Sequence, residues 1–249
     1  QYPYAITLGA LPENKAELVY QVGKQIGLDL KSAGIHYNLS PLADINNNPN
    51  NPVIGYRSFG EHKEKVANFA VEYLKGMSEV GVLGCLKHFP GHGDTATDSH
   101  LGLPILNKTK AELETEELLP FQYGIDHGVE MIMVGHLAVP ALTGGKDIPA
   151  SISRELITDL LKGEMGFKGL VISDALNMKA VANLHPEPGE LEWQAFHAGN
   201  DILCFSDHVK EGIEKIAQNA SDEEVDAVYE KVMDLKKRLG VIETKPIEV

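Results

Sequence analysis

The stretch KHFPGHGDTATDSH, residues 87–100, holds the densest set of reactive side chains in this chain: a lysine, three histidines and two aspartates around a Pro-Gly pair. Three kinds of structure could use such residues: a metal site, a loop that transfers protons, or a polar turn without a chemical role. Asp98 and His100 lie two residues apart, within reach of each other. A carboxylate beside an imidazole can orient the ring, fix its tautomer and raise its basicity. Proton transfer is therefore one hypothesis for this stretch.

Metal binding is the main alternative, because barrel metallohydrolases use histidine and aspartate as ligands. The possible ligands are His88, His92, Asp94 and His100. Pro90 and Gly91 separate the first two histidines, so these cannot face one another as i and i+4 residues of a helix. The residues alone leave both hypotheses open.

Other polar residues stand where short apolar runs end. Asp174 follows the run VIS, and a carboxylate that leaves a buried strand is costly unless it is paired or used. Asp44 and Arg57 are candidates for sugar recognition, which needs carboxylates and forked donors for hydroxyl groups. His136 fits a core histidine or a pocket wall equally well. Asp201 begins an apolar run and is interpreted as structural.

The chain alternates helical patterns with these apolar runs. The predicted helices are 13–33, 61–80, a capped helix from Thr109 that Pro120 divides, 153–161, 189–198 and 221–240. The predicted strands are HYNLSPLADI, VLGCLKHF, EMIMVGHLAV, GLVISDAL and DILCFS. Strands that are almost wholly apolar indicate a parallel sheet covered on both faces. The asparagine-rich segment 46–51 is interpreted as turns.

Repeated β-then-α order is typical of a doubly wound sheet or a (β/α) barrel. Polar residues at the end of almost every strand favour the barrel, where those ends share one face. We therefore expect an α/β fold of the (β/α)8 TIM type. Because only five strands are convincing, we expect a single barrel domain over residues 1–249 that supplies about five β/α units and lacks the N-terminal ones.

Composition and the absence of certain motifs exclude several classes of binding partner and cofactor. The 249 residues are 43% hydrophobic and carry a net charge of −14, which repels nucleic acids and anionic membrane surfaces. No apolar run approaches the roughly 18 residues of a membrane span. No glycine-rich phosphate motif follows a strand, so no nucleotide cofactor is expected. Cys85 and Cys204 lie in apolar runs and are expected to be buried free thiols. The compartment stays open between bacterial cytoplasm and periplasm, and the sequence does not give the oligomeric state.

Three segments carry a resemblance to a known family. KHFPGHGDTATDSHLGLP, LSPLADINNNPNNPVIGYRSFG and GLVISDALNM are similar to motifs of glycoside hydrolase family 3, in its β-N-acetylhexosaminidase branch. The match runs through almost the whole chain in order and spacing. The first motif is the most specific of the three, because the general β-glucosidase branch lacks the Asp-Ser-His ending.

The resemblance implies a fold and a set of roles. The family domain is a (β/α)8 barrel, and its first three strands would precede this segment. Asp174 would be the nucleophile, and the Asp98–His100 pair would be the acid/base. The residues that would bind the N-acetylglucosamine unit are Asp44, Arg57, Lys87 and His88. No metal and no cofactor is required. An arginine and an acidic Gly-Gly turn that the family carries upstream are absent here.

The expected function is that of a retaining glycosidase, which needs one group to attack the anomeric carbon and another to protonate the leaving oxygen. The enzyme would release terminal β-linked N-acetylglucosamine from amino-sugar glycans or peptidoglycan fragments, so its partner is a small carbohydrate. The alternatives are a β-N-acetylglucosaminide phosphorylase, a β-glucosidase-like member of the family, and a sugar-binding protein without turnover. Turnover with and without phosphate separates the first of these from a hydrolase.

Overall fold

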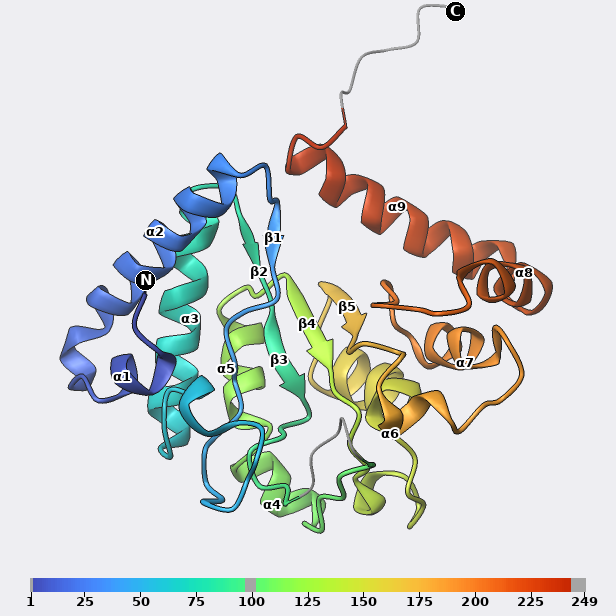
Figure 1. Cartoon of the computed structure of the whole chain (residues 1–249), viewed down its shortest axis with the longest axis horizontal. Helices are drawn as coiled ribbons and strands as arrows, with labels where there is room; N and C mark the ends of the chain where they lie inside the picture. The colour runs from blue at the N-terminus through green and yellow to red at the C-terminus, as the bar shows by residue number, and fades with distance from the viewer. Residues whose placement is uncertain (1, 97–101, 243–249) are drawn as a thin grey trace, which may run out of the picture.

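The fold is a set of parallel strands with helices packed around them (Figure 1). It is seen here in a computed structural model that describes residues 2–96 and 102–242. β1 (Tyr37–Asn38) pairs with β2 (Leu83–Gly84), and β3 (Leu86–Phe89) pairs with β4 (Met131–Val134), which pairs with β5 (Leu170–Ser173). Bridges from Leu42 to Lys87 and from Ile172 to Ile202 extend this array at both sides. The predicted α/β class with barrel-like parallel strands is confirmed.

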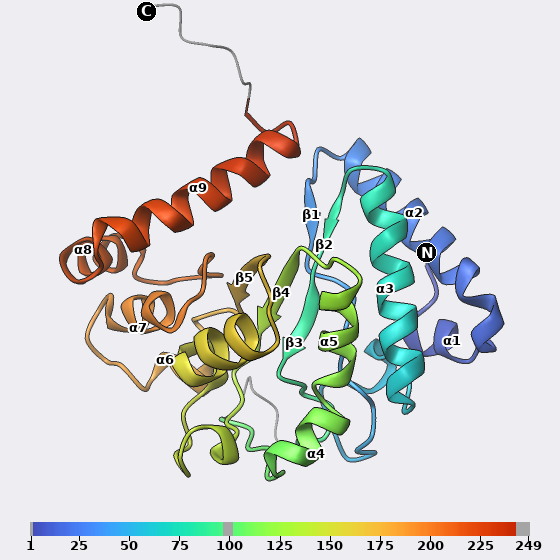
Figure 2. The same cartoon turned by 180° about the vertical axis from the view of Figure 1, so that it is seen from behind.

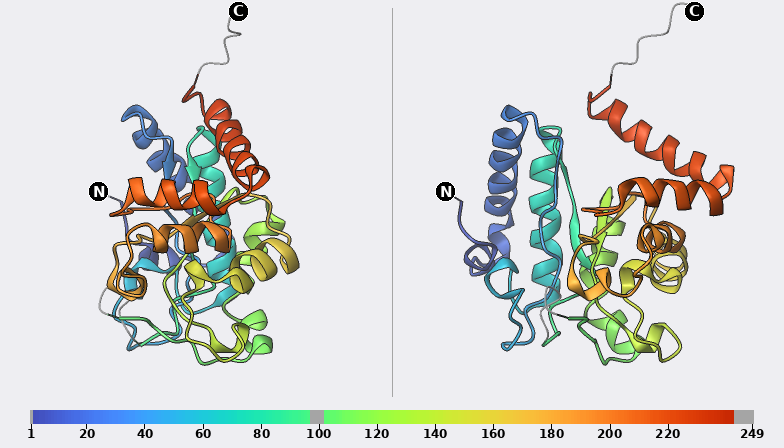
Figure 3. Two further views of the ribbon diagram at one scale, coloured as in Figure 1. Left: turned by 90° about the vertical axis from the view of Figure 1, so that its right-hand side faces the viewer. Right: turned by 45° about the vertical axis from the view of Figure 1, so that its right-hand side comes forward.

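The helices follow the predicted alternation with the strands. They are α1 (Ala5–Gly9), α2 (Ala16–Ser32), α3 (Lys63–Glu79), α4 (Lys110–Thr115), α5 (Leu119–Asp126), α6 (Lys179–Ala182), α7 (Glu190–Ala198), α8 (Val209–Asn219) and α9 (Asp222–Arg238). Shorter or irregular turns are η1 (Glu13–Lys15), η2 (Gly55–Arg57), η3 (Pro140–Leu142), η4 (Ala150–Ile152) and the π-helical η5 (Glu155–Glu164). Figure 3 shows α2 and α3 on one side of the strands and α7 to α9 on the other.

Both predicted capping boxes are present, at Thr109 with Glu112 and at Ser221 with Glu224. Pro120 lies in the first turn of α5, so the predicted division of this helical segment is also confirmed. The last predicted strand, DILCFS, makes only the single bridge at Ile202. The strand VLGCLKHF is divided at Cys85, whose amide donates to the carbonyl oxygen of Ser40 at 2.9 Å.

Helices α2 and α3 pack so closely that their backbones nearly touch. A Cβ atom built on Gly23 would lie 2.2 Å from the carbonyl oxygen of Tyr73, and one on Gly76 would lie 2.1 Å from that of Tyr20. The spacing of Leu18, Val22, Ile26 and Leu30 predicts one apolar row on α2, and Val22 and Ile26 of that row pack against the core. The fully buried residues of α2 are Val19, Gly23 and Gly27. Leu18 of that row is 48% exposed. Small residues bring the two helices together here.

The strands bury both faces, as their apolar character predicts. Ile132, Val134 and Val171 belong to a core that includes Phe69 of α3 and Phe121 of α5. Figure 2 shows these two helices beside the strands. The alternate strand residues form a second core, together with Leu235 of α9; they are Leu83, Cys85, Met131, Met133, Leu170 and Ile172. Among the described residues no helix is both long and apolar enough to cross a membrane.

Candidate active site

The candidate active site lies where the parallel strands end. Lys87 and His88 lie in β3, next to its C-terminal residue Phe89, and Asp174 directly follows β5. Parallel pairing aligns these ends: Phe89 is in register with Val134, and Val134 with Ser173. The amide of Asp174 donates to the carbonyl oxygen of Val134 at 2.9 Å. The structure thus brings the strand-end residues singled out in the sequence to one end of the array.

Asp44 lies in the loop after β1, contacts β3 and the loop that follows β3, and has no exposed surface. Its carboxylate accepts hydrogen bonds from the His88 amide at 3.1 Å, from His88 Nδ1 at 2.7 Å and from the His92 amide at 2.7 Å. Burial alone would raise the pKa of Asp44, but His88 and the hydrogen bonds outweigh burial and lower it. The contact of Asp44 with a sugar stays a prediction.

Lys87 and Arg57 line one cleft of about 260 Å³, together with Tyr4 and Tyr73. Arg57 ends η2 and donates from Nη1 to the carbonyl oxygen of Val53 at 3.1 Å. Burial and the positive charge of Arg57 lower the pKa of Lys87, and Asp174 and Asp44 oppose that shift. Lys87 therefore interacts electrostatically with the cation of Arg57 and with the carboxylates of Asp174 and Asp44.

Asp174 is a partly exposed carboxylate held by its own turn. The amide of Ala175 donates to Asp174 Oδ1 at 2.8 Å. Burial alone would raise the pKa of Asp174, but His88, His136, this amide and Lys87 together lower it. The carboxylate is therefore ionised at neutral pH, the state that a nucleophile or a general base requires.

His136 follows β4 and is fully buried. Its Nε2 lies 2.8 Å from the carbonyl oxygen of Ala175, and its Nδ1 lies 2.6 Å from Ser151 Oγ. The sequence left this histidine open between core and pocket wall. It is a core residue that contacts the turn carrying Asp174.

Asn51 holds the first part of the histidine-rich loop, a role that the interpretation of 46–51 as turns missed. Its Nδ2 donates to the carbonyl oxygens of His92 at 2.8 Å and Gly93 at 2.9 Å. Its Oδ1 accepts from the amides of Val53 at 2.8 Å and Ile54 at 2.9 Å. One buried amide therefore connects two loops that are distant in sequence.

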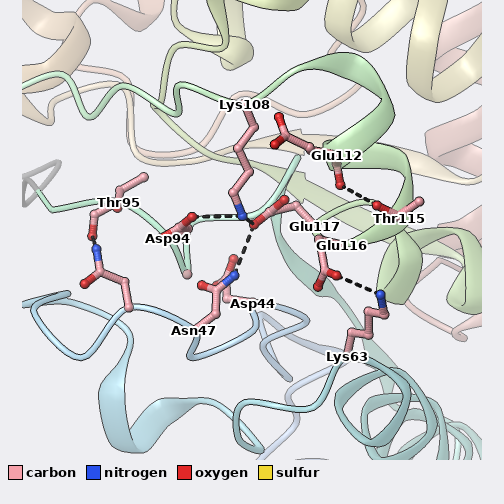
Figure 4. A network of polar contacts seen from close by, with 12 residues as sticks. Asp44, Asn47, Lys63, Asp94, Thr95, Lys108, Glu112, Thr115, Glu116 and Glu117 are labelled. Atoms are coloured by element: carbon pink, nitrogen blue, oxygen red, sulfur yellow. Dashed lines mark hydrogen bonds and ion pairs between the residues drawn. The ribbon is translucent and has the colours of Figure 1, made fainter.

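A second set of polar contacts, around Lys108, holds the same loop (Figure 4). Lys108 pairs with Asp94 at 2.8 Å and also with Glu117, which is only 2% exposed and accepts from Asn47 Nδ2 at 3.2 Å. Hydrogen bonds to both carboxylates raise the pKa of Lys108 although burial acts in the opposite direction. The sequence analysis did not single out Lys108 or Glu117. We call Asn47, Asp94, Lys108 and Glu117 the loop-anchor cluster.

Three of the possible metal ligands of the sequence analysis, His88, His92 and Asp94, are engaged in other contacts. Asp94 belongs to the loop-anchor cluster, and His92 Nδ1 lies 2.7 Å from Thr95 Oγ1. Within residues 2–96 and 102–242, no group of three or more His, Cys, Asp or Glu side chains is placed to hold a metal ion. Asp98 and His100, the expected acid/base pair, lie outside the residues that the structure describes. Asp201 is structural, as interpreted: its Oδ2 accepts from the Val171 amide at 2.7 Å.

Comparison with known proteins gives a consistent set of relatives. Residues 1–237 match the family described as the glycosyl hydrolase family 3 N terminal domain. Beta-hexosaminidase A of Pseudoalteromonas piscicida is 39% identical over 195 residues, which cover 74% of this chain and 32% of that protein. Beta-hexosaminidase of Stenotrophomonas maltophilia (strain R551-3) is 32% identical over 215 residues, which cover 84% of this chain and 62% of that protein. The chain thus spans 32% and 62% of the lengths of these two relatives.

Solved structures show the same likeness. A glycoside hydrolase family 3 beta-N-acetylglucosaminidase from Paenibacillus sp. str. FPU-7 aligns with a TM-score of 0.90 at 36% identity, over 98% of this chain and 47% of that one. The beta-glucoside phosphorylase BglX aligns with a TM-score of 0.89 at 25% identity, over 98% of this chain and 45% of that one.

Proposed function

The chain belongs to glycosyl hydrolase family 3, and from that premise we propose that it is the catalytic segment of a retaining β-N-acetylhexosaminidase. Its substrate is a terminal β-linked N-acetylglucosamine on an amino-sugar glycan or a peptidoglycan fragment. The observation that carries the proposal is the ionised carboxylate of Asp174, which follows a buried strand and lies among Lys87, His88 and His136. The named relatives, which are beta-hexosaminidases, support the choice of sugar.

Asp174 is the nucleophile in this proposal. One of its oxygens forms a bond to the anomeric carbon while the bond from that carbon to the leaving oxygen breaks, and the leaving oxygen takes a proton from the acid. Water then attacks the same carbon, releases Asp174 and returns a proton to the base. The lowered pKa of Asp174 supports this role, because only the ionised carboxylate can attack. The acid/base is His100 with Asp98, a role proposed from the sequence motif alone.

The sugar-binding residues proposed from the motifs are Asp44, Arg57, Lys87 and His88. Asp44 occupies Nδ1 of His88, so the imidazole can contact a sugar hydroxyl only through Nε2. Lys87 and Arg57 line one cleft and are proposed as donors to hydroxyl groups. Both cations also favour the ionised form of a nearby carboxylate nucleophile.

A 2-fluoro or epoxide sugar tests the nucleophile. We expect covalent label on Asp174 in peptide mapping by mass spectrometry, and loss of label in Asp174→Asn. Label on Asp44 or Asp201 would assign the nucleophile to another residue. Absence of label, with turnover intact, would favour attack by the acetamide of the substrate.

Aryl glycosides test the substrate and the acceptor. We expect faster turnover of an aryl β-N-acetylglucosaminide than of the matching β-glucoside, with free N-acetylglucosamine as product at any phosphate concentration. Likeness to the beta-glucoside phosphorylase BglX makes phosphate the necessary variable. Turnover that requires phosphate and yields the sugar 1-phosphate would replace the hydrolase with a phosphorylase.

A further inference from the structure

The turn that carries Asp174 is held by three neighbours, and one of them is a side chain. The amide of Asp174 donates to Val134, and the amide of Leu176 donates to the carbonyl oxygen of Cys204, both at 2.9 Å. Between them, the carbonyl oxygen of Ala175 contacts Nε2 of His136 at 2.8 Å. The amide of the same Ala175 donates to Asp174 Oδ1. The position of residue 175 therefore determines where the nucleophilic carboxylate lies.

The hydrogen bonds of His136 fix its tautomer. A carbonyl oxygen can only accept, so Nε2 carries a proton and donates it to Ala175. In the neutral ring Nδ1 is then the acceptor, and the hydroxyl of Ser151 in η4 donates to it at 2.6 Å. Neither side chain has exposed surface. Water cannot replace either bond without a rearrangement of the core.

Asn200 connects this pair to α7. Its Nδ2 donates to the carbonyl oxygen of Ser151 at 2.8 Å and to that of Ala195 at 2.6 Å. Asn200 is 1% exposed, and its Oδ1 has no hydrogen-bond partner among the residues that the structure describes. A continuous set of buried hydrogen bonds thus runs from the end of α7 through η4 to the turn after β5.

We propose that His136, Ser151 and Asn200 are positioning residues that orient the Asp174 carboxylate for attack by holding Ala175. This inference rests on the proposed function. Ser151 fixes the His136 tautomer that donates to Ala175, and Asn200 fixes the backbone of Ser151. None of the three needs to touch the sugar. An imidazole in the other tautomer would present a lone pair to the Ala175 carbonyl and would repel it.

The pKa of Asp174 gives a measurable readout of this hydrogen-bond network. The titratable groups that act on Asp174, or on which it acts, are Lys87, His88, His92, His136, Cys85 and Cys204. The hydrogen bond from the Ala175 amide is one of the contacts that lower the pKa of Asp174. Loss of His136 releases the Ala175 carbonyl and weakens that hydrogen bond, so the pKa of Asp174 should rise, and the acidic limb of the kcat/KM profile should move to higher pH.

The test compares His136→Leu, His136→Gln and Ser151→Ala in the full-length protein. His136→Leu should lower kcat by about 10²-fold with little change in KM, since misplacement of a reacting group by about 1 Å has that effect. His136→Gln keeps an N–H that can reach Ala175 and should recover most of kcat. Ser151→Ala, which removes only the hydroxyl, should show a smaller loss. His127→Gln is the control, because His127 is exposed, contacts the carbonyl oxygen of Tyr123 at 2.7 Å and lies before β4, at the opposite end of that strand from His136.

A titration by ¹³C NMR of labelled aspartate carboxyl groups, assigned with Asp174→Asn, gives a readout that does not need turnover. It should show a raised pKa of Asp174 in His136→Leu and an unchanged one in His127→Gln. Wild-type kcat and an unshifted pKa in His136→Leu would overturn the network, as would equal losses in the Gln and Leu variants. Absence of turnover in the wild type would refute the proposed function instead. If His136→Leu fails to fold, Ser151→Ala decides by the same two measurements.

Discussion

Asp44 is the residue on which the polar contacts of the site converge. Its buried carboxylate accepts from two backbone amides and one imidazole, all on β3 or the loop after it. No other side chain of similar size could accept three donors from one place, because an amide would present its own N–H groups to them. Asp44 therefore stabilises the backbone shape on which Lys87 and His88 depend.

Asp44→Asn should lower the free energy of unfolding by about 3 kcal/mol at pH 7, because it leaves buried donors without an acceptor. The pKa of Asp44 is lowered in the folded state, so its contribution is complete above the unfolded pKa of about 3.9 and is lost as pH falls through the folded pKa. Urea unfolding should show the difference between variant and wild type shrinking in acid. The exposed Asp159→Asn is the control, and a difference independent of pH would contradict the assignment.

His100→Ala should slow substrates with poor leaving groups by roughly 10²–10⁴-fold, the usual cost of a lost general acid. Activated aryl glycosides should suffer less in the glycosylation step, because they leave without a proton. Asp98→Asn should show the same pattern more weakly through a misoriented imidazole. Steady-state kinetics over a leaving-group series measures this. Equal losses across the series, with a wild type that chelator inactivates, would instead indicate a metal-ligand role.

The sequence could predict the candidate residues that lie at the ends of predicted strands, such as Asp44, Lys87 and Asp174. A polar residue after an apolar run is visible locally. Asn51, Glu117 and Ser151 could not be predicted in this way, because their partners lie 41, 70 and 15 residues away. Their types are ordinary for surface loops, and only the folded chain shows that they are buried.

At the scale of elements, the contacts of the loop-anchor cluster fix the position of the histidine-rich loop where it follows β3. Lys108 lies between two carboxylates, and one of them, Glu117, is almost completely buried. Gly91 passes so close that a Cβ atom there would lie 2.7 Å from Glu117 Cβ. The loop is thus fixed both by charge and by close backbone packing.

Lys108→Met should lower the free energy of unfolding by about 3–5 kcal/mol, because it leaves Glu117 buried without its cation. Lys108→Met combined with Glu117→Leu should recover much of that loss, since the unpaired charge is gone. Denaturant unfolding of the single and double variants measures the coupling. Lys110→Met, which removes an exposed pair with Glu164, is the control and should change stability little. Additive losses in the double variant would show that the pair is not coupled.

The element predictions succeeded where one amphipathic face packs against a large core. In α3 the spacing of Val66, Phe69, Tyr73 and Met77 predicts that these residues face inward, and all four are buried. In α2 the predicted row of large apolar residues is only partly buried, because the glycines at 23 and 27 lie closest to α3 and the large residues pack at the edge of that contact. Periodicity gives the direction of a face only when burial scales with side-chain size.

At the scale of the whole molecule, the net charge of −14 sets how the protein responds to salt. Repulsion among like charges destabilises the compact state, and added ions screen it. The described ion pairs are mostly at the surface, where screening costs little. The N-acetylglucosamine unit that the site is proposed to bind is neutral, so the binding of an uncharged N-acetylglucosaminide involves no net charge to be screened.

Sodium chloride at about 0.5 M should therefore raise the melting temperature by about 1–3 °C relative to low salt. The kcat/KM for a neutral aryl glycoside should change little over the same range. Chloride is the proper salt, because sulfate also stabilises proteins by exclusion from their surface. Differential scanning calorimetry and initial-rate assays measure the two quantities. A lower melting temperature in chloride would show that attractive ion pairs outweigh the net repulsion.

The order of the strands has a consequence for how the protein is made. The segment of β1 and Leu42 pairs with β2 and with Lys87 of β3, β3 pairs with β4, β4 pairs with β5, and β5 has a bridge to Ile202. A ribosome releases the chain from its N-terminus at about 5–20 residues per second. Every strand therefore emerges when its partner is already outside the tunnel, and α2 and α3 can close on one another before β4 is translated. Asp174 is the last of these four strand-end residues to arrive, so the proposed nucleophile is added to a framework that Asp44, Lys87 and His88 have already built.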